Sequence, residues 1–366
     1  MAEADERGYK RAGVDLGAAG RTLDLITREV ESTYTAGVLK GLGAFGGLFE
    51  LPSGYRRPVL VASTDGVGTK VMLAGRFAAE LTAEPPRGER SAADEPGTAE
   101  SRALEARAVL AAIGSDLVNH CVNDILVQGA KPLFFLDYVA SSRLVPEATA
   151  ALVSGIAGAC RAADMALLGG ETAEMPGVYR PGEFDLAGTI VGIVDKERII
   201  DGSTVTVGDV LLGLPSGGLQ TNGFSLARAA LADAMHERLA EGTAVWRALL
   251  APHSSFLPVV GPLLAIGAIK AMAHITGGGL PGNLPRALPD GMGARLERGT
   301  WPEPEIFARL QRHGGVSDEE MFEVFNMGVG FVLIVAAERS EELVRASGGR
   351  LRRIGVVSDS GTVEIV

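Results

Sequence analysis

The stretch STDGVGTK, at residues 63–70, constrains this chain more than any other part of it. An apolar run at residues 58–62 leads straight into it, which predicts a buried strand that ends in hydroxyl, carboxylate, glycine and lysine groups. These groups are Thr64, Asp65, Gly66, Gly68, Thr69 and Lys70. Glycine lets backbone N–H groups approach oxygen atoms, lysine neutralises negative charge, and aspartate can hold Mg²⁺. The stretch therefore suits a phosphate chain with its metal ion, although a polar turn after a strand would contain similar residues by chance.

The length of 366 residues favours two domains over one. Hydrophobic residues make up 46% and charged residues 22%, which is an ordinary globular composition with enough material for a sizeable core. The formal net charge of −11 argues against a nucleic-acid partner and against an anionic membrane surface. An anionic ligand would have to be held locally, by backbone amides, metal ions and a few basic side chains.

The two cysteines, Cys121 and Cys160, stand in apolar surroundings, which predicts small buried residues and no disulfide framework. No apolar run reaches the length of a transmembrane helix, and the first residues do not resemble a signal peptide. We therefore expect a cytoplasmic protein with no membrane partner.

A glycine-rich stretch at residues 40–49 precedes the opening motif. Its four glycines, which rule out a stable helix, are Gly41, Gly43, Gly46 and Gly47. The stretch predicts either a flexible loop whose amides cover a phosphate or a glycine-rich turn or bulge. Residues 76–112 are low in complexity and predict a disordered insertion, with a helix running into it from the motif and another resuming near Ser101.

The middle of residues 114–132 predicts a helix with one apolar and one polar face. The polar face carries short side chains at helical spacing, namely Asp116, Asn119, His120, Asn123 and Asp124. Such side chains coordinate ions or nucleotide edges, whereas an ordinary solvated face usually carries lysine, arginine or glutamate. Both interpretations of this polar face remain open.

A second apolar run, at residues 165–168, stops abruptly at Gly169, Gly170, Glu171 and Thr172. This predicts another strand that ends in glycines, a carboxylate and a hydroxyl. Open α/β sheets bind ligands at strand ends, so the two strand ends support each other.

The polar segment at 195–209 predicts a domain boundary, with domains at 1–200 and 201–366. Two loops of the second half each run from a strand into a helix, which favours anion binding. The first loop contains Ser216, Gln220, Thr221 and Asn222, and the second contains His274, Thr276, Gly277, Gly278 and Gly279. The alternation of strands and helices predicts an α/β or α+β fold in two domains.

The acidic groups Asp65, Asp116 with Asp124, and Glu171 lie far apart in the sequence, and each ends a strand or faces off a helix. That pattern suits two or more Mg²⁺ ions on a nucleoside triphosphate and phosphoryl transfer to a second substrate. The chain lacks the Walker A and GxSxG motifs.

Together these motifs resemble phosphoribosylformylglycinamidine cyclo-ligase, also called aminoimidazole ribonucleotide (AIR) synthetase. The most specific matches are GGETAEMPG, DGVGTK and HITGGG, while the spacing from Asp124 to GAKP at 129–132 resembles a wider superfamily. The resemblance runs in order from residue 9 to residue 330. It implies an N-terminal domain of mixed sheet with helices on one side, which pairs across a homodimer into a barrel, and a C-terminal α/β domain.

The resemblance also implies ATP-dependent closure of formylglycinamidine ribonucleotide (FGAM) to AIR, with release of ADP and phosphate, in purine biosynthesis. Asp65, Asp124 and Glu171 would then hold Mg²⁺, and Lys70 would act on the phosphates together with Asp65. Further nucleotide contacts would come from Gly41, Gly43, Gly46, Gly47, Thr64, Gly66, Gly68, Thr69, Asp116, Asn123, Gly169, Gly170 and Thr172. The substrate would contact Ser216, Gln220, Thr221, Asn222, Thr276, Gly277, Gly278 and Gly279.

His274 is the candidate for proton transfer at the closing ring, with a buried, hydrogen-bonded histidine as the alternative. The chain departs from the family at Gln220, where the family loop usually carries a histidine; glutamine cannot shuttle a proton at neutral pH. Either that histidine is positional, or His274 or His120 takes its role. The segment between Lys70 and Gly114 is also longer than is usual in the family. Another ATP-using superfamily member, such as a small-molecule kinase, and a catalytically silent binding paralogue remain as alternatives.

Overall fold

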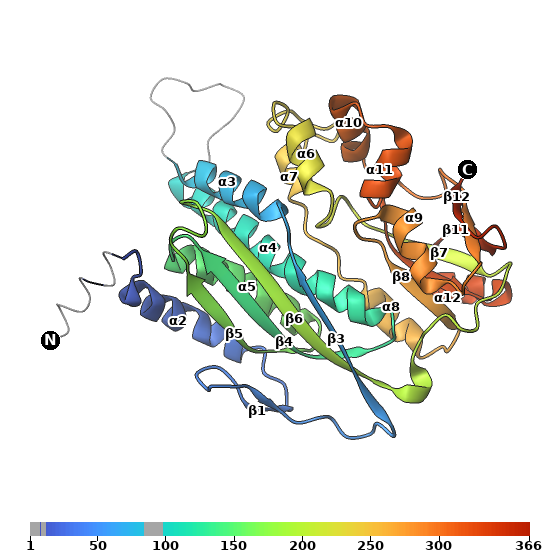
Figure 1. Cartoon of the computed structure of the whole chain (residues 1–366), viewed down its shortest axis with the longest axis horizontal. Coiled ribbons are helices and arrows are strands. Elements are labelled where there is room, and N and C mark those ends of the chain that lie inside the picture. The colour runs from blue at the N-terminus through green and yellow to red at the C-terminus, as the bar shows by residue number, and fades with distance from the viewer. Residues whose placement is uncertain (1–7, 9–11, 84–97) are drawn as a thin grey trace. The chain divides into compact units, whose positions relative to one another are not determined.

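The computed structural model describes residues 8, 12–83 and 98–366 (Figure 1). The chain forms two compact units. Unit 1 comprises residues 1–51, 64–118 and 134–189, and unit 2 comprises residues 52–63, 119–133 and 190–366. The elements β3, α4, β4 and β6 run from one unit into the other. The domain boundary near residue 200 stays a prediction.

The helices are α2 (Leu16–Glu31), α3 (Lys70–Thr82), α4 (Ala99–Leu126), α5 (Pro146–Ala162), α6 (Phe224–Ala230), α7 (Val245–Leu249), α8 (Leu257–Leu264), α9 (Gly279–Asn283), α10 (Glu305–Gly314), α11 (Asp318–Val324) and α12 (Ser340–Ala346). Short 3₁₀ turns are η1 (Lys196–Arg198), η2 (Leu284–Ala287) and η3 (Ala337–Arg339). The strands are β1 (Val38–Lys40), β2 (Leu48–Phe49), β3 (Pro58–Gly66), β4 (Lys131–Ser141), β5 (Ala166–Glu174), β6 (Phe184–Asp195), β7 (Val210–Pro215), β8 (Ile269–His274), β9 (Gly293–Leu296), β10 (Val329–Val335), β11 (Arg352–Ser358) and β12 (Val363–Ile365).

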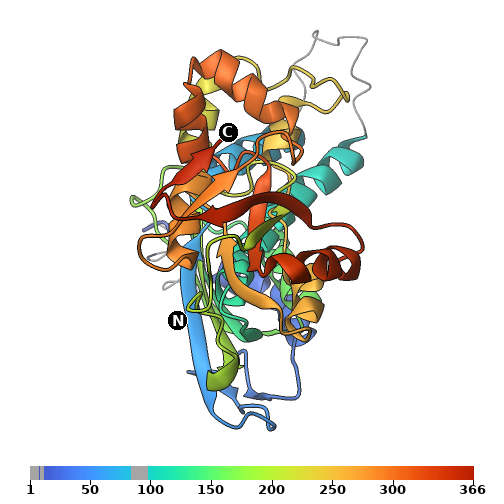
Figure 2. The same cartoon turned by 90° about the vertical axis from the view of Figure 1, so that its right-hand side faces the viewer.

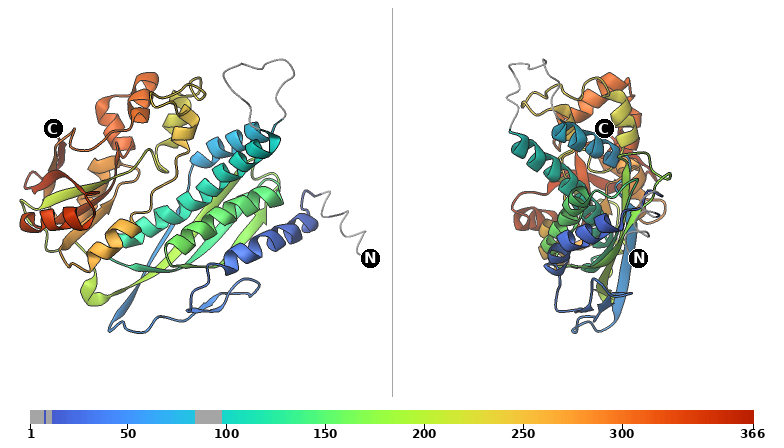
Figure 3. Two further views of the ribbon diagram at one scale, coloured as in Figure 1. Left: turned by 180° about the vertical axis from the view of Figure 1, so that it is seen from behind. Right: turned by 90° about the vertical axis from the view of Figure 1, so that its left-hand side faces the viewer.

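A four-stranded sheet in the order β3-β6-β4-β5 organises unit 1. β4 and β5 are parallel, in register from Phe134 opposite Ala166 to Ser141 opposite Glu174. In unit 1, α2, α5 and the N-terminal part of α4 cover one face of this sheet (Figures 1 and 3). This agrees with the prediction of helices on one side.

Helix α2 begins where Asp15 caps it, because the Asp15 carboxylate accepts the N–H groups of Gly17 and Ala18. Its buried residues, Ala18, Thr22, Ile26 and Val30, recur every four positions and so form one face. That face packs against α5 and β5.

Helices α4 and α5 cross at two glycines. A Cβ atom on Gly114 would overlap the carbonyl oxygen of Leu152, and one on Gly155 would overlap that of Ala111. The helix backbones therefore approach each other more closely than any larger residue would allow.

Unit 2 is built on a six-stranded sheet in the order β12-β9-β11-β7-β10-β8, coloured yellow to red in Figure 2. All its described pairings are antiparallel except β12 with β9, so the sheet is mixed. All seven residues of β10 are buried, between β7 on one side and β8 on the other. The core of the unit also includes Val260 and Leu263 of α8 and Leu343 of α12.

The helices expected at both ends of residues 76–112 are present, since α3 continues to Thr82 and α4 starts at Ala99. Residues 84–97, on which the expected disordered stretch falls, lie outside the described residues. One expectation about strand ends needs correction: β5 does not stop at Gly169 but continues to Glu174. Its pairing with β4 extends over Glu171 and beyond, and partners in a neighbouring strand override the local break in hydrophobicity.

Both cysteines are buried and neither belongs to a disulfide, as predicted. Within the described ranges, no helix is both long enough and apolar enough to cross a membrane.

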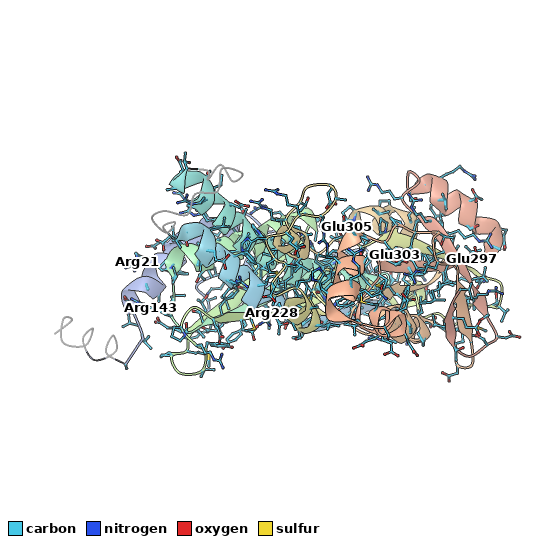
Figure 4. All side chains as sticks on the ribbon, turned by 90° about the horizontal axis from the view of Figure 1, so that it is seen from above. Arg21, Arg143, Arg228, Glu297, Glu303 and Glu305 are labelled. Atoms are coloured by element: carbon cyan, nitrogen blue, oxygen red, sulfur yellow. The ribbon has the colours of Figure 1, made fainter. Side chains whose placement is uncertain are left out.

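At the surface of unit 2, Arg298 pairs with Glu303 at 2.9 Å and with Asp318 at 2.8 Å. Glu303 is labelled in Figure 4.

Candidate active site

The opening motif lies partly inside β3 and partly in the turn before α3. Asp65 is still in the strand; it is exposed, and its Oδ1 accepts the N–H of Gly66 at 2.7 Å. Thr64 shares a hydrogen bond of 2.8 Å with Thr189 through their hydroxyls. Gly68 adopts φ = 69°, a left-handed conformation that favours glycine, and the turn then leads into α3 at Lys70. The motif thus presents an exposed carboxylate beside a glycine-dependent turn.

Lys70 is fully buried in unit 1. Its Nζ lies 2.7 Å from Oδ2 of Asp116, and both side chains are 0% exposed. The sequence placed Lys70 at phosphates and Asp116 at the nucleotide; the structure shows that they form an ion pair. Their roles at a nucleotide stay predictions.

The glycine-rich stretch forms the turn between β1 and β2. Gly41 and Gly47 are required by packing, since Cβ atoms there would overlap Tyr34 and Leu168 respectively. The hydroxyl of Tyr34 also accepts the N–H of Leu42 at 2.7 Å. Gly43 and Gly46 have nothing within 4 Å of a would-be Cβ, so the tip of the turn is open. Of the four glycines of this turn, these two leave space beside the backbone where a Cβ would stand.

Gly169, Gly170, Glu171 and Thr172 line a cavity of about 250 Å³ in unit 1, together with apolar residues of α2. Asp137 of β4 also lines it, and burial raises the pKa of this carboxyl to about 7. A Cβ atom on Gly170 would overlap the Asp137 side chain, so glycine is needed for the two strands to pair here. Sequence reasoning did not single out Asp137, which follows apolar residues in a strand.

In unit 2, Asp124 and His274 are in direct contact. Oδ1 of Asp124 lies 2.9 Å from Nδ1 of His274, and Oδ2 accepts the hydroxyl of Ser63 at 2.9 Å. Burial alone would raise the pKa of Asp124. The hydrogen bond with His274 and the charges of His120 and His274 outweigh it and hold the pKa below its usual value. Asp124 is therefore an ionised carboxylate next to an imidazole.

The loop at 216–222 is held from inside unit 2. Asn326 accepts the hydroxyl of Ser216 at 2.8 Å and donates to the carbonyl of Gly218 at 2.9 Å. Gln220 is buried and adopts φ = 62°, an unusual conformation for a residue with a Cβ. A Cβ on Gly330 would lie 2.9 Å from Nε2 of Gln220, so this amide packs against β10.

Thr221 lies next to two histidines. Its hydroxyl is 3.0 Å from Nδ1 of His120 and 3.1 Å from Nδ1 of His253. His253 was missed by sequence reasoning, because it lies in a loop without periodicity. Helix α4 holds that loop: Asn119 donates to the carbonyl of His253, and Asn123 to that of Ser254, both at 2.8 Å. The polar face of α4 is therefore largely a packing surface for this loop.

The loop at 276–279 depends on its glycines and on Asn283. Gly278 and Gly279 have φ of 95° and 57°, and a Cβ on Gly279 would overlap the carbonyl of Phe322. Asn283 donates to the carbonyls of Gly279 at 2.8 Å and Gly277 at 3.2 Å. This fixes the loop directly after His274, at the end of β8.

The chain is similar to named enzymes over nearly its whole length. A phosphoribosylformylglycinamidine cyclo-ligase of Burkholderia mallei (strain SAVP1) is 46% identical, over 98% of this chain and 95% of the relative. The enzyme of the same name from Geobacillus thermodenitrificans (strain NG80-2) is 46% identical, over 93% of this chain and 91% of the relative. This chain belongs to the phosphoribosylformylglycinamidine cyclo-ligase family. The resemblance stated from the motifs is confirmed, and the family is one of ligases.

Models of both domains of AIR synthase related proteins match this cyclo-ligase family member. The N-terminal domain model matches residues 98–194 and the C-terminal domain model residues 206–366.

Solved structures confirm the fold. A hydrogenase maturation protein HypE in complex with ATP aligns with a TM-score of 0.62 at 18% identity, over 95% of this chain and 90% of that chain. Thiamine-monophosphate kinase from Stenotrophomonas maltophilia K279a aligns with a TM-score of 0.61 at 18% identity, over 94% and 95%. The two-domain α/β prediction is therefore correct at the level of fold.

Proposed function

We propose that this chain catalyses the ATP-dependent closure of FGAM to AIR, with release of ADP and phosphate, in purine biosynthesis. The observation that carries the proposal is the 46% identity to cyclo-ligases over 98% of the chain. In this reaction the formyl amide oxygen is phosphorylated, an amidine nitrogen attacks the same carbon, and phosphate leaves with the oxygen. Phosphorylation is needed because an amide oxygen is otherwise a poor leaving group.

The donor set of the chain fits the Mg²⁺ that such a reaction requires. Asp65 and Glu171 are exposed carboxylates, and the Asp124 carboxylate is partly exposed. Mg²⁺ prefers oxygen ligands of this kind. We propose that Asp65, Asp124 and Glu171 serve as ligands of more than one Mg²⁺ ion, which would neutralise the charge of the triphosphate. Asp65 and Glu171 lie on β3 and β5, the two edge strands of the sheet, so they would hold different ions.

Nucleotide binding is proposed for the motif and the open turn. The amides at Gly43 and Gly46 have room beside them for phosphate oxygens. We also propose that the nucleotide contacts Thr64, Thr69 and Lys70 of the motif, together with the other nucleotide-binding residues predicted from the sequence. Because Lys70 is buried in an ion pair with Asp116, it would act in one of two ways. It would either hold the motif in position, or contact the phosphates after the ion pair opens.

His274 is proposed to transfer a proton at the closing ring. Its Nδ1 faces the Asp124 carboxylate, which fixes the orientation of the ring, and its Nε2 lies 3.2 Å from Nε2 of His253. The loops at 216–222 and 276–279 are proposed to bind FGAM, since both are rigid and rich in amides and hydroxyls. We also propose a cytoplasmic homodimer, with domains at 1–200 and 201–366 and N-terminal sheets joined into a barrel.

The test is ADP release measured with a coupled assay, comparing ATP plus Mg²⁺ with and without FGAM. We expect ADP release to require FGAM and to yield one AIR per ADP. Asp65→Asn should lower turnover about 100-fold or more, since it removes one charge from the proposed metal ligands. Because Asp65 is exposed, this variant should unfold at the wild-type temperature. A folded wild-type protein that shows no FGAM-dependent turnover would refute the proposal.

A further inference from the structure

Three of the five histidines of the chain gather in unit 2. His120 comes from α4, His253 from the loop before α8, and His274 from the end of β8. The three residues are 5%, 1% and 7% exposed, and the centroids of their rings lie 5.0–5.3 Å apart. A buried cluster of three imidazoles is chemically unlike the carboxylates proposed for Mg²⁺, and it calls for an explanation of its own.

Each of the three rings has its Nδ1 against an oxygen atom. Asp124 lies 2.9 Å from Nδ1 of His274, while Thr221 lies 3.0 Å from Nδ1 of His120 and 3.1 Å from Nδ1 of His253. A carboxylate can only accept, so His274 carries a proton on Nδ1 and, when neutral, a lone pair on Nε2. Metal-binding histidines are held in this way, with one ring nitrogen on an oxygen and the other on the ion.

The amide of Asn123 fixes the tautomer of His253. Its Oδ1 accepts the N–H of Phe256 at 2.9 Å and its Nδ2 donates to the carbonyl of Ser254 at 2.8 Å, so the amide cannot be flipped. An N–H of Asn123 therefore faces Nε2 of His253, 3.2 Å away, which makes that nitrogen an acceptor. Nε2 of His274 lies 3.2 Å from the same nitrogen. When His274 is neutral, two ring lone pairs face each other here, and either a proton on Nε2 of His274 or a metal ion bound by both nitrogens removes their repulsion.

We propose that His120, His253 and His274 form a binding site for a divalent transition-metal ion. Zinc binds imidazole at 2.0–2.1 Å, so a tetrahedral site puts ligand nitrogens about 3.3 Å and ring centroids about 5.2 Å apart. The two Nε2 atoms at 3.2 Å and the centroids at 5.0–5.3 Å match this geometry. One nitrogen from each of the three rings lies within 4.8 Å of the others, so His120 must move toward the other two rings for all three to bind one ion. Neutral imidazoles select Zn²⁺, Co²⁺, Ni²⁺ or Cu²⁺ over Mg²⁺.

The metal site has a consequence for catalysis. Only this consequence, and not the site itself, rests on the proposed function. An ion on Nε2 of His274 occupies the lone pair that proton transfer would use. We therefore expect Zn²⁺ to inhibit FGAM-dependent ADP release by the wild-type protein. Binding of the ion itself does not depend on which reaction the protein catalyses.

Binding is tested with the full chain, freed of metal by a chelator and titrated with Co²⁺ as a spectroscopic probe. We expect one ion per chain, with the intense visible bands of four-coordinate Co²⁺ and displacement by Zn²⁺. His253→Gln and His120→Gln should lose these bands. Thr221→Val, which removes the oxygen beside two of the rings, should weaken binding about 10- to 100-fold.

The exposed histidines His236 and His313 provide matched controls. His236→Gln and His313→Gln should bind Co²⁺ like the wild type, and circular dichroism should show that every variant is folded. A wild type without stoichiometric binding, or a folded His253→Gln that binds as tightly as the wild type, would overturn the site. Failure of FGAM turnover would leave this spectroscopic result unaffected, so the two proposals fail separately.

Discussion

Lys70 shows how burial decides what a charged side chain does. It belongs to a motif that predicts phosphate binding, yet its Nζ lies 2.7 Å from Oδ2 of Asp116, and neither side chain is exposed. Taking two charges out of water is costly, and the pair is stable only as long as both members are present. Part of the motif is therefore needed for the fold of unit 1 as well as for any ligand.

We expect Lys70→Met to lower the free energy of unfolding by about 3–5 kcal/mol, because it leaves Asp116 buried without its counter-charge. Lys70→Met combined with Asp116→Leu should be less destabilising than Lys70→Met alone. Urea unfolding of the three proteins gives the comparison. If Lys70→Met unfolds at the wild-type urea concentration, the pair has no structural importance.

Asp137 predicts a pH dependence. Burial raises its pKa to about 7, so the folded protein keeps this proton at pH values where the unfolded chain has lost it. Stability from Asp137 is complete below about pH 4 and is lost as the pH rises through about 7. Asp137→Asn should remove this loss and be up to about 4 kcal/mol more stable than wild type at pH 8, at about 1.4 kcal/mol per pKa unit.

The measurement is the difference in unfolding free energy between wild type and Asp137→Asn across this pH range. Other carboxylates contribute equally to both proteins and cancel in the difference. A difference that stays constant with pH would show that the carboxyl is ionised in the folded state throughout.

For single residues, the sequence predicted which residues belong to the site better than it predicted their neighbours in the structure. Asp124 and His274 were both proposed as site residues, and they are in contact. Their link to His253 could not be predicted, because a loop without periodicity carries no signal for its position. That position is set by Asn119 and Asn123, more than 120 positions earlier in the chain.

At the scale of elements, the crossing of α4 and α5 depends on glycine. Gly155→Ala should destabilise the protein by about 1–3 kcal/mol or more, because the new methyl group overlaps the carbonyl of Ala111. Gly158→Ala is the matched control in the same helix. There only the end of the Arg161 side chain lies nearby, at 3.8 Å, and alanine should stabilise the helix by about 0.5–1 kcal/mol. Thermal unfolding of both variants tests this; equal shifts would show that the helices do not cross so closely.

Apolar periodicity predicted the elements well, and their ends less well. The apolar face of α4 is buried as expected, with Leu117, Val118, Cys121 and Val122 all 0% exposed. Its polar face is buried too at Asn123, because a loop distant in sequence covers it. Likewise β5 continues past its glycines because β4 pairs with it. Local sequence shows what a segment prefers, while its partners decide where it ends.

At the scale of the whole molecule, one side of the unit 1 sheet bears on the proposed homodimer. Phe135 of β4 is 0% exposed, whereas Leu136 and Tyr138 are 38% and 37% exposed. Side chains alternate along a strand, so Leu136 and Tyr138 lie on the face of the sheet opposite to Phe135. Phe45 and Leu48, at the glycine-rich turn of the same unit, are exposed as well. Grouped apolar side chains on a surface are typical of an interface.

We therefore expect sedimentation to give a mass of twice 38.0 kDa for the wild type. Leu136→Glu should shift the protein toward 38.0 kDa, because it places a charge in the proposed apolar interface. Leu104→Glu is the control: Leu104 is 68% exposed but lies on α4, among the helices that cover the other face of the sheet. A wild type that sediments as a single chain, or an equal effect of the two substitutions, would place the interface elsewhere or remove it. Only if Leu136→Glu alone dissociates the dimer do two unit 1 sheets meet through this face.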